Sequence, residues 1–278
     1  MNAVNYQEIG RKVCEIDRLL RTEILVKDGK NQEKKLWENT FIKHQIDKRK
    51  RGELFSTGDH VRAMVYSMLS GGISWERVEN NIDAKTGAIT SVDRIFHQYD
   101  ISFLRECNPD ELANQIKGIG CASQSTYKQM TALIQKNIPK LIRFEDKYGS
   151  IDSYYDRYRT SDNSHKALVC ILSNPNSDDK FAQLAEPLVA EYLKNVGYDL
   201  AKPDRHIRRI LGKKDRAAFG CSEYDTAGLY ETFDIIDNIA REINKDSAEV
   251  DFILWSICAK GYGNLWSNTS LQERIINM

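Results

Sequence analysis

The sequence predicts an all-α protein, and three observations support that prediction. Apolar residues recur at helical spacing from one end of the chain to the other. Only five prolines interrupt the 278 residues. Helix start and stop signals border the apolar stretches, such as Asp204 after Pro203 and Gly197 after Val196. A chain of this length can bury a full core, in one large domain or in two modest ones.

Each apolar stretch gives one expected helix. The first covers residues 5–26 and the second 31–46, after which the basic run Lys48-Arg49-Lys50-Arg51 forms a loop. An apolar helix from His60 to Leu69 breaks at Gly71-Gly72. The remaining expected helices cover 91–98, 100–107, 109–117, 123–137, 139–146, 150–158, 163–172, 184–196, 204–211, 229–244 and 247–260, and the tail 267–278 can dock through its apolar residues.

Composition excludes several classes of protein. With 41% hydrophobic and 29% charged residues, the chain has no window as apolar as a membrane span. The N-terminus lacks the basic and apolar regions of a signal peptide, so we expect a cytoplasmic, bacterial-type protein with no membrane partner. Six scattered cysteines, none in a C-x-x-C pair, predict free and mostly buried thiols rather than disulfides or a metal site.

The stretch from Leu184 to Gly212 is the candidate functional centre. Its apolar residues predict a helix that ends at Gly197, where glycine can adopt the left-handed conformation. Pro203 keeps the preceding residue extended, and Asp204 is a good N-cap for a second helix. A carboxylate at this position is either a simple cap or a reactive group.

Forty basic and forty acidic residues cancel, so the distribution of charge is more informative than its sum. Two basic clusters stand out: the run at 48–51, and the set Arg205, Arg208, Arg209, Lys213, Lys214 and Arg216. Either cluster can be a solvated helix face or a nucleic-acid contact. The second cluster lies beside Asp204, which favours the contact there.

Three motifs occur in order along the chain: the apolar segment from Met64 to Ser74, the loop Ile116-Lys117-Gly118-Ile119-Gly120, and the stretch Pro203-Asp204-Arg205-His206-Ile207-Arg208-Arg209. Together they resemble the helix-hairpin-helix DNA glycosylase superfamily, the group that includes endonuclease III and the adenine, alkylpurine and oxoguanine glycosylases. The third motif resembles its Asp-x-His-Ile/Val-x-Arg signature. The segment Met64 to Ser74 is similar to its early buried helix. Ile116-Lys117-Gly118-Ile119-Gly120, followed by Ser125-Thr126-Tyr127-Lys128, is similar to its Ile-x-x-Ile-Gly loop. The resemblance covers roughly residues 60–212.

The resemblance implies a two-lobed helical fold with a cleft between the lobes. One domain would cover 62–190, and a discontinuous domain of 1–61 and 191–278 would carry Asp204 as the catalytic residue. The implied partner is double-stranded DNA with a damaged or modified base, bound by a monomer without cofactor or metal. DNA contacts are expected at Arg205, Arg208, Lys213, Lys214, Gly118, Gly120 and Lys128. Arg209 would form a structural ion pair.

The chain also departs from the family pattern. Both glycines of the family hairpin are absent from Gln183-Leu184-Ala185-Glu186-Pro187, which puts the hairpin's shape and its phosphate contact in question. The family's lyase lysine is replaced by Glu186-Pro187, so simple base release is favoured over strand cleavage. Lys180 and Lys202 are alternative nucleophiles, and Ser70, Gly72 and Trp75 are candidate pocket residues, although Trp75 also fits the core.

Two hypotheses follow. The first is a monofunctional DNA glycosylase, and the alternative is a non-catalytic DNA-binding or scaffold protein that keeps the fold. His206 is more typical of a packing residue than of a catalyst, and Tyr154, Tyr155 and Tyr158 have the helical spacing of core aromatics.

Overall fold

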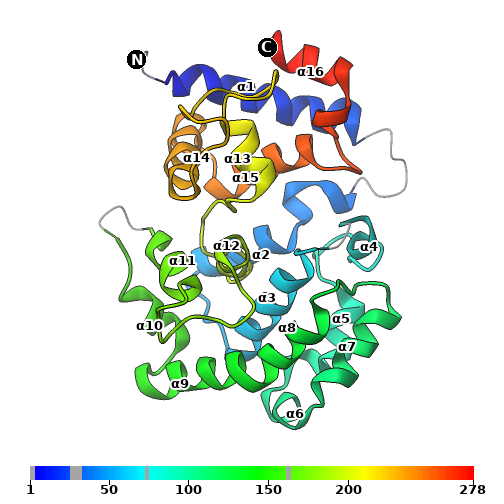
Figure 1. Cartoon of the computed structure of the whole chain (residues 1–278), viewed down its shortest axis with the longest axis vertical. Coiled ribbons are helices and arrows are strands. Elements are labelled where there is room, and N and C mark those ends of the chain that lie inside the picture. Colours follow the sequence, from blue (N-terminus) through cyan, green and yellow to red (C-terminus); the bar gives the residue numbers. More distant parts are fainter. Residues whose placement is uncertain (1–3, 26–32, 73–74, 161–163) are drawn as a thin grey trace. The chain divides into compact units, whose positions relative to one another are not determined.

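The structure, a computed structural model, describes residues 4–25, 33–72, 75–160 and 164–278 (Figure 1). Every named element in these ranges is helical, and one isolated bridge joins Ile82 and Ile89. The all-α prediction is therefore confirmed. No described helix has both the length and the apolar composition to cross a bilayer.

Internal contacts divide the chain into two compact units. The central unit is Asn39–Tyr198, and the terminal unit combines Met1–Glu38 with Asp199–Met278. The terminal segments thus share a unit, but the boundaries differ from those expected from the sequence, because residues 39–61 and 191–198 lie in the central unit. The reason is packing: helix α12 (Glu186–Asn195) contacts both α2 (Phe41–Lys50) and α3 (Thr57–Leu69).

The central unit is built around α3 and α12, which lie side by side (Figure 1). Ser56 and Asp59 form a capping box at the start of α3, and its apolar residues from Val61 to Leu69 are buried. The other α-helices of this unit are α4 (Trp75–Glu79), α5 (Thr90–Ile95), α6 (Ile101–Glu106), α7 (Pro109–Gly118), α8 (Thr126–Ala132), α9 (Ile138–Tyr148), α10 (Ile151–Asp156) and α11 (Lys166–Ser173).

Helices α8 and α9 are joined without a break by a π-helical turn, Leu133–Asn137. The sequence predicted two separate helices, 123–137 and 139–146. Pro139 lies just after the π-helical turn, the kind of irregularity at which a continuous helix accommodates a missing N–H. The buried Asn137 at the end of the turn becomes available for a contact outside the helix.

The terminal unit packs α1 (Tyr6–Leu19) against α14 (Leu229–Ile243) and α15 (Ser247–Cys258). A π-helical turn, Leu20–Ile24, extends α1. Helix α13 (Arg205–Leu211) packs on α14 and α15, so the candidate site rests on the core of this unit. The tail forms α16 (Thr269–Ile276), which buries Leu271 and Ile275.

The first basic cluster corrects one prediction. Lys48, Arg49 and Lys50 form the last turn of α2 rather than a loop, because Thr40 caps a helix that begins only at Phe41. Positive charge in a last turn also suits the helix dipole. The expected helix 31–46 is instead two short 3₁₀ turns, Glu33–Lys35 and Trp37–Asn39, followed by α2. Expected features at 26–32, 73–74 and 161–163 lie outside the described residues.

Candidate active site

Asp204 is the N-cap of α13, as the sequence predicted. Its backbone is extended, and Oδ1 accepts hydrogen bonds from the N–H groups of His206 at 2.8 Å and Ile207 at 3.2 Å. The other carboxylate oxygen has no hydrogen-bond partner within the described part of the chain. The cap therefore orients the carboxylate and leaves one oxygen for other chemistry.

Two carboxylates, the exposed Asp199 and the buried Asp251, hold the segment that leads to Asp204. Asp199 accepts a hydrogen bond from the N–H of Ala248 at 2.8 Å, at the start of α15. Asp251, on the same helix, accepts one from the N–H of Lys202 at 3.1 Å. Although Asp199 keeps contact with solvent, the protein around its carboxyl desolvates it and raises its pKa to about 6; the Ala248 N–H acts against this shift and nearby Asp246 adds to it. Sequence reasoning missed both residues, because nothing in their local pattern distinguishes them from surface carboxylates.

His206 and Cys258 lie in the electrostatic surroundings of Asp204. Burial lowers the pKa of His206, with the positive charges of Arg205, Arg209 and Lys202 acting in the same direction and Asp204 acting against them. Burial also raises the pKa of the Cys258 thiol well above its usual value, and the charge of Asp204 adds to this. Cys258 is thus a neutral thiol in the core rather than a nucleophile.

The arginines of α13 differ in their contacts. Arg209 forms the predicted structural ion pair, with Nε and NH2 at 2.5 and 2.7 Å from Asp215, and its guanidinium lies 4.0 Å from the centre of the Trp266 ring. Arg208 donates from Nε to the carbonyl of Ala227 at 2.7 Å. Arg208 therefore has a structural contact, and any contact with DNA would come in addition to it.

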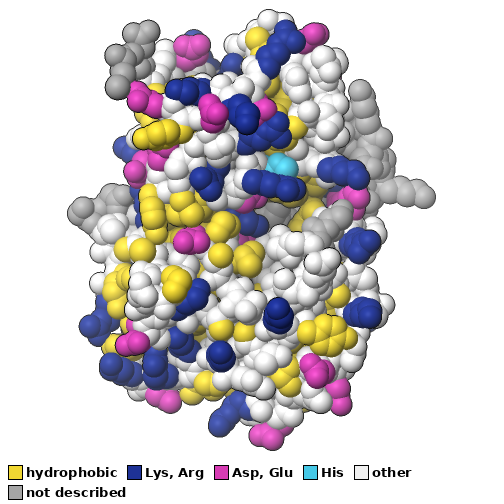
Figure 2. All heavy atoms as spheres, in the orientation of Figure 1, with side chains coloured by type: hydrophobic (Ala, Val, Ile, Leu, Met, Phe, Trp, Pro, Cys, Tyr) yellow, Lys and Arg dark blue, Asp and Glu magenta, His cyan; other side chains and the backbone are white. Residues whose placement is uncertain are grey.

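The remaining basic residues of this cluster are exposed. Arg205, Lys213, Lys214 and Arg216 have no side-chain hydrogen bond or ion pair with any described residue. The loop that carries three of them is fixed to α13, since the N–H groups of Phe219 and Ser222 bind the carbonyls of Ile210 and Leu211. Lys and Arg side chains gather on the face shown in Figure 2, around the position of α13 in Figure 1. This surface can attract a polyanion.

The helical hairpin before Asp204 lacks glycine but keeps a left-handed residue. Gln183 has φ +61°, and Asn137 fixes its neighbour Ala182 by donating to the carbonyl at 3.0 Å and accepting from the N–H at 2.8 Å. The N–H groups of 183–186 have no hydrogen-bond partner within the described ranges. Loss of the glycines has therefore not removed the turn.

Neither alternative nucleophile lies at the sequence position of the family's lyase lysine. Glu186 opens α12, with Pro187 behind it. Lys180 donates from Nζ to the carbonyls of Ser173 at 2.8 Å and Leu184 at 3.5 Å, so its ammonium is bound to the hairpin. The main chain of Lys202 is held by Asp251, as described above.

The other predicted site residues lie in the central unit. Gly118 ends α7, and Gly120 has φ +77°, with open space where a Cβ would lie in each case. Lys128 borders a groove of about 280 Å³ that Tyr127, Lys136 and Gln183 also line. Ser70 caps the end of α3 and Gly72 turns with φ +83° against Ser123, while Trp75 is half-buried at the start of α4.

Other expectations concern the thiols, the aromatics and metal binding. All six cysteines are free, but only Cys121, Cys221 and Cys258 are buried, so "mostly buried" was too strong. Tyr154 and Tyr155 are core residues, as predicted. Among the described residues, no group of three or more His, Cys, Asp or Glu side chains is placed to hold a metal ion.

Comparison with solved structures finds two that are similar to this chain. Both are from Methanocaldococcus jannaschii: an 8-oxoguanine glycosylase/lyase in complex with a 15mer DNA containing 8-oxoguanine, and an 8-oxoguanine DNA glycosylase. The first is 18% identical, with 87% of this chain and 95% of the other covered and a TM-score of 0.48. The second is 19% identical, with 88% and 92% covered and a TM-score of 0.46.

No protein-family profile and no curated protein matches the sequence.

Proposed function

We propose that the chain is a DNA glycosylase that hydrolyses the N-glycosidic bond of a damaged or modified base, with Asp204 as its catalytic residue. One observation carries the proposal. The Asp204 carboxylate stands at the start of α13, oriented through one oxygen and unbound at the other, within a signature that resembles the glycosylase superfamily.

The chemistry fits a fixed carboxylate. Breaking an N-glycosidic bond builds positive charge on the sugar, as in the cleavage of glycosides generally. A carboxylate beside the sugar stabilises that charge and can accept a proton from an attacking water. The hydrogen bonds to His206 and Ile207 hold Asp204 in one orientation, so little reorganisation is needed during the reaction. The reaction requires only water and no cofactor.

Double-stranded DNA is the proposed substrate, bound by a monomer in a bacterial-type cytoplasm. An enzyme that acts on a base in a duplex must first rotate that nucleotide out of the stack. Arg205, Lys213 and Lys214 are exposed and without side-chain partners among the described residues, so they can neutralise phosphates while the base is displaced. Arg208 keeps a structural bond to Ala227, which leaves it a secondary contact.

We further propose that base release occurs without strand cleavage. A lyase step needs an amine that attacks the sugar and forms a Schiff base. Glu186 offers no amine, and the Nζ of Lys180 is occupied by two carbonyls. Borohydride trapping with the wild type tests this point, because only an amine intermediate leaves a covalent protein–DNA adduct. An adduct would show a lyase, and its loss in Lys202→Gln or Lys180→Gln would identify the nucleophile.

The decisive experiment compares the wild type with Asp204→Asn on duplexes that carry different lesions, with alkali cleavage of the abasic product. Asparagine is as good an N-cap as aspartate, so the variant should keep its fold. We expect base release by the wild type to fall at least about 100-fold in Asp204→Asn, the usual cost of losing an acid–base group. Asp225→Asn, at an exposed carboxylate, is the matched control.

Failure would be unambiguous. Product formed equally by wild type and Asp204→Asn would refute the catalytic role of Asp204. Absence of product with every lesion, together with tight duplex binding, would favour the non-catalytic DNA-binding alternative.

A further inference from the structure

Helix α12 ends in a tightly determined turn just before the chain leaves the central unit. The N–H groups of Gly197 and Tyr198 bind the carbonyls of Lys194 at 2.8 Å and Leu193 at 3.0 Å, the pattern of a Schellman cap. Gly197 has φ +79°, and a Cβ there would lie 2.3 Å from the carbonyl oxygen of Gln45 on α2. The turn is therefore pressed against a neighbouring helix.

Arg49 of α2 binds the carbonyl of Val196, which this cap does not use. Its Nε and NH2 both donate to the carbonyl of Val196, at 2.8 and 2.6 Å. The guanidinium lies between two rings, 3.9 Å from the centre of Tyr198 and 4.5 Å from that of Phe55. Although Arg49 belongs to a basic run, its side chain is thus committed to this turn.

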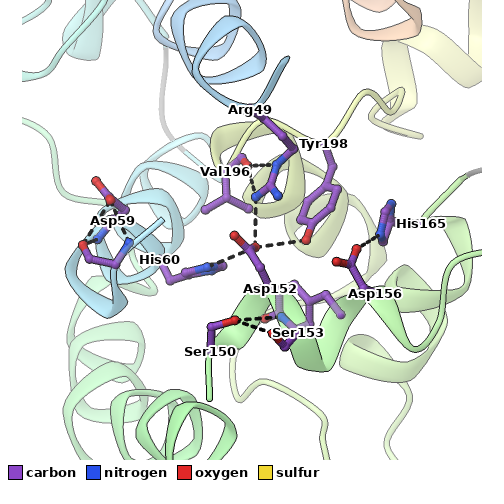
Figure 3. A network of polar contacts seen from close by, with 12 residues as sticks. Arg49, Asp59, His60, Ser150, Asp152, Ser153, Asp156, His165, Val196 and Tyr198 are labelled. Carbon is purple, nitrogen blue, oxygen red and sulfur yellow. Dashed lines mark hydrogen bonds and ion pairs between the residues drawn. The ribbon is translucent and has the colours of Figure 1, made fainter. Parts of the chain in front are cut away.

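Asp152 of α10 completes the arrangement (Figure 3). Its Oδ1 accepts from Arg49 NH2 at 3.0 Å and from the Tyr198 hydroxyl at 3.1 Å, and it lies 3.6 Å from Nε2 of the fully buried His60. Burial alone would raise the pKa of Asp152, but His60 and Arg49 outweigh it and hold that pKa well below its usual range. Asp152 is therefore a carboxylate, and its negative charge balances the positive charge of Arg49 where Arg49 binds Val196.

A second set of contacts fixes His60 behind Asp152. Nδ1 of His60 and the Tyr192 hydroxyl are 2.7 Å apart, and the hydroxyls of Tyr192 and Tyr155 are 2.8 Å apart. Tyr192 lies on α12 and Tyr155 on α10, so helices α3, α10 and α12 meet at this network. Its members have little freedom to move independently.

We propose that Arg49, Asp152 and Tyr198 form a latch that holds the end of α12 and with it the first end of the segment that leads to Asp204. Five residues lie between Tyr198 and Asp204. Hydrogen bonds of Asp199 and Asp251 hold residues 199–202 of this segment. The latch holds the residue before them, Tyr198. Arg49 is then a positioning residue for base excision, an assignment that rests on the proposed function.

The test uses the full chain with Arg49→Lys and Tyr198→Phe, and with Arg51→Met as the matched control. Lysine keeps the charge but cannot bind Val196 and Asp152 with a planar fork. Phenylalanine removes only the hydroxyl bond to Asp152. Arg51 belongs to the same basic run but is exposed and pairs with Glu53 at 2.6 Å.

Two readouts separate a positioning role from a merely structural one. Amide hydrogen exchange at 196–198 should accelerate about tenfold or more in Arg49→Lys, and less in Tyr198→Phe, while the rest of α12 keeps its protection. Single-turnover base release should fall about 10- to 100-fold in Arg49→Lys, with duplex affinity changed by less than about threefold, because misplacement affects the reaction more than binding. Arg51→Met should change neither.

Unchanged exchange at 196–198 in Arg49→Lys would overturn the latch. Faster exchange with an unchanged single-turnover rate would overturn the positioning role. If the wild type releases no base from any lesion, the proposed function fails and the positioning role with it, whereas exchange still decides whether Arg49 fixes the turn.

Discussion

The carboxylate of Asp251 accepts a hydrogen bond from the main-chain N–H of Lys202, two residues before Asp204. Asp251 is 3% exposed, so the bond lies in the core of the terminal unit. It links α15 to the extended segment that precedes α13. The position of Asp204 thus depends on a residue 47 positions later in the chain.

Replacing Asp251 with alanine should therefore lower both stability and activity. Removing the acceptor takes away the hydrogen bond of the partly buried N–H of Lys202, at a cost of about 1 kcal/mol in the free energy of unfolding. We expect slower single-turnover base release as well, because Asp204 loses a support. Asp251→Asn keeps an oxygen acceptor and should be milder in both measurements. Equal urea denaturation curves for wild type and Asp251→Ala would contradict the role of this bond.

Asp199 should make stability depend on pH. Its pKa rises from 3.8 to about 6 on folding, so the folded state holds the proton more tightly than the unfolded state. The resulting stabilisation is complete below pH about 4 and is lost as the pH rises through about 6. Asp199→Asn, which carries no charge, should gain less than about 1 kcal/mol relative to the wild type between pH 5 and pH 8, because Asp199 is partly in contact with solvent, which weakens the effect.

Thermal unfolding of both proteins across this pH range measures the effect. The exposed Asp225→Asn serves as the control, and its difference from the wild type should stay constant. A pH-independent difference between wild type and Asp199→Asn would show that desolvation does not perturb this carboxyl.

The sequence was sufficient for the helices and for the local geometry of Asp204. Apolar spacing is a local signal, as are the Pro203-Asp204 start and the Gly197 stop, and all three are present in the structure. Helix junctions were less predictable. The π-helical turn at Leu133–Asn137 and the late start of α2 at Phe41 depend on packing that no short window encodes.

The residues that hold the segment before Asp204 could not be predicted either, because their contacts join distant parts of the chain. Arg49 reads as part of a solvated basic run, yet it binds Val196, 147 positions later. The local sequence does not show that Asp251 is buried, or that Asp251 and the exposed Asp199 both accept main-chain hydrogen bonds over 49 positions. Such pairs become visible only when distant segments are brought together, since charge alone does not distinguish a buried carboxylate from an exposed one.

Two glycines offer a matched test of close packing. Gly197→Ala would place a Cβ 2.3 Å from the carbonyl of Gln45, in a left-handed conformation that L residues disfavour. We expect a loss of at least about 2 kcal/mol, from the combined strain and clash. Gly118→Ala lies at a helix end with no atom within 4 Å of the new Cβ, and should be neutral or slightly stabilising. Chemical denaturation gives the free energy of unfolding of both variants. Equal values for Gly197→Ala and Gly118→Ala would refute the tight contact at Gly197.

The salt dependence of DNA binding tests the exposed cluster beside Asp204. Lys213 and Lys214 have no side-chain partner among the described residues, so their replacement should not disturb the fold. Each lysine that neutralises a phosphate contributes about 0.9 to the slope of log K against log salt. The double variant Lys213→Gln/Lys214→Gln should therefore bind an undamaged duplex more weakly and with a slope smaller by about 2. Lys260→Gln, at another exposed lysine of the terminal unit, should leave the slope unchanged. An equal reduction in both proteins would mean that net charge, rather than this surface, governs binding.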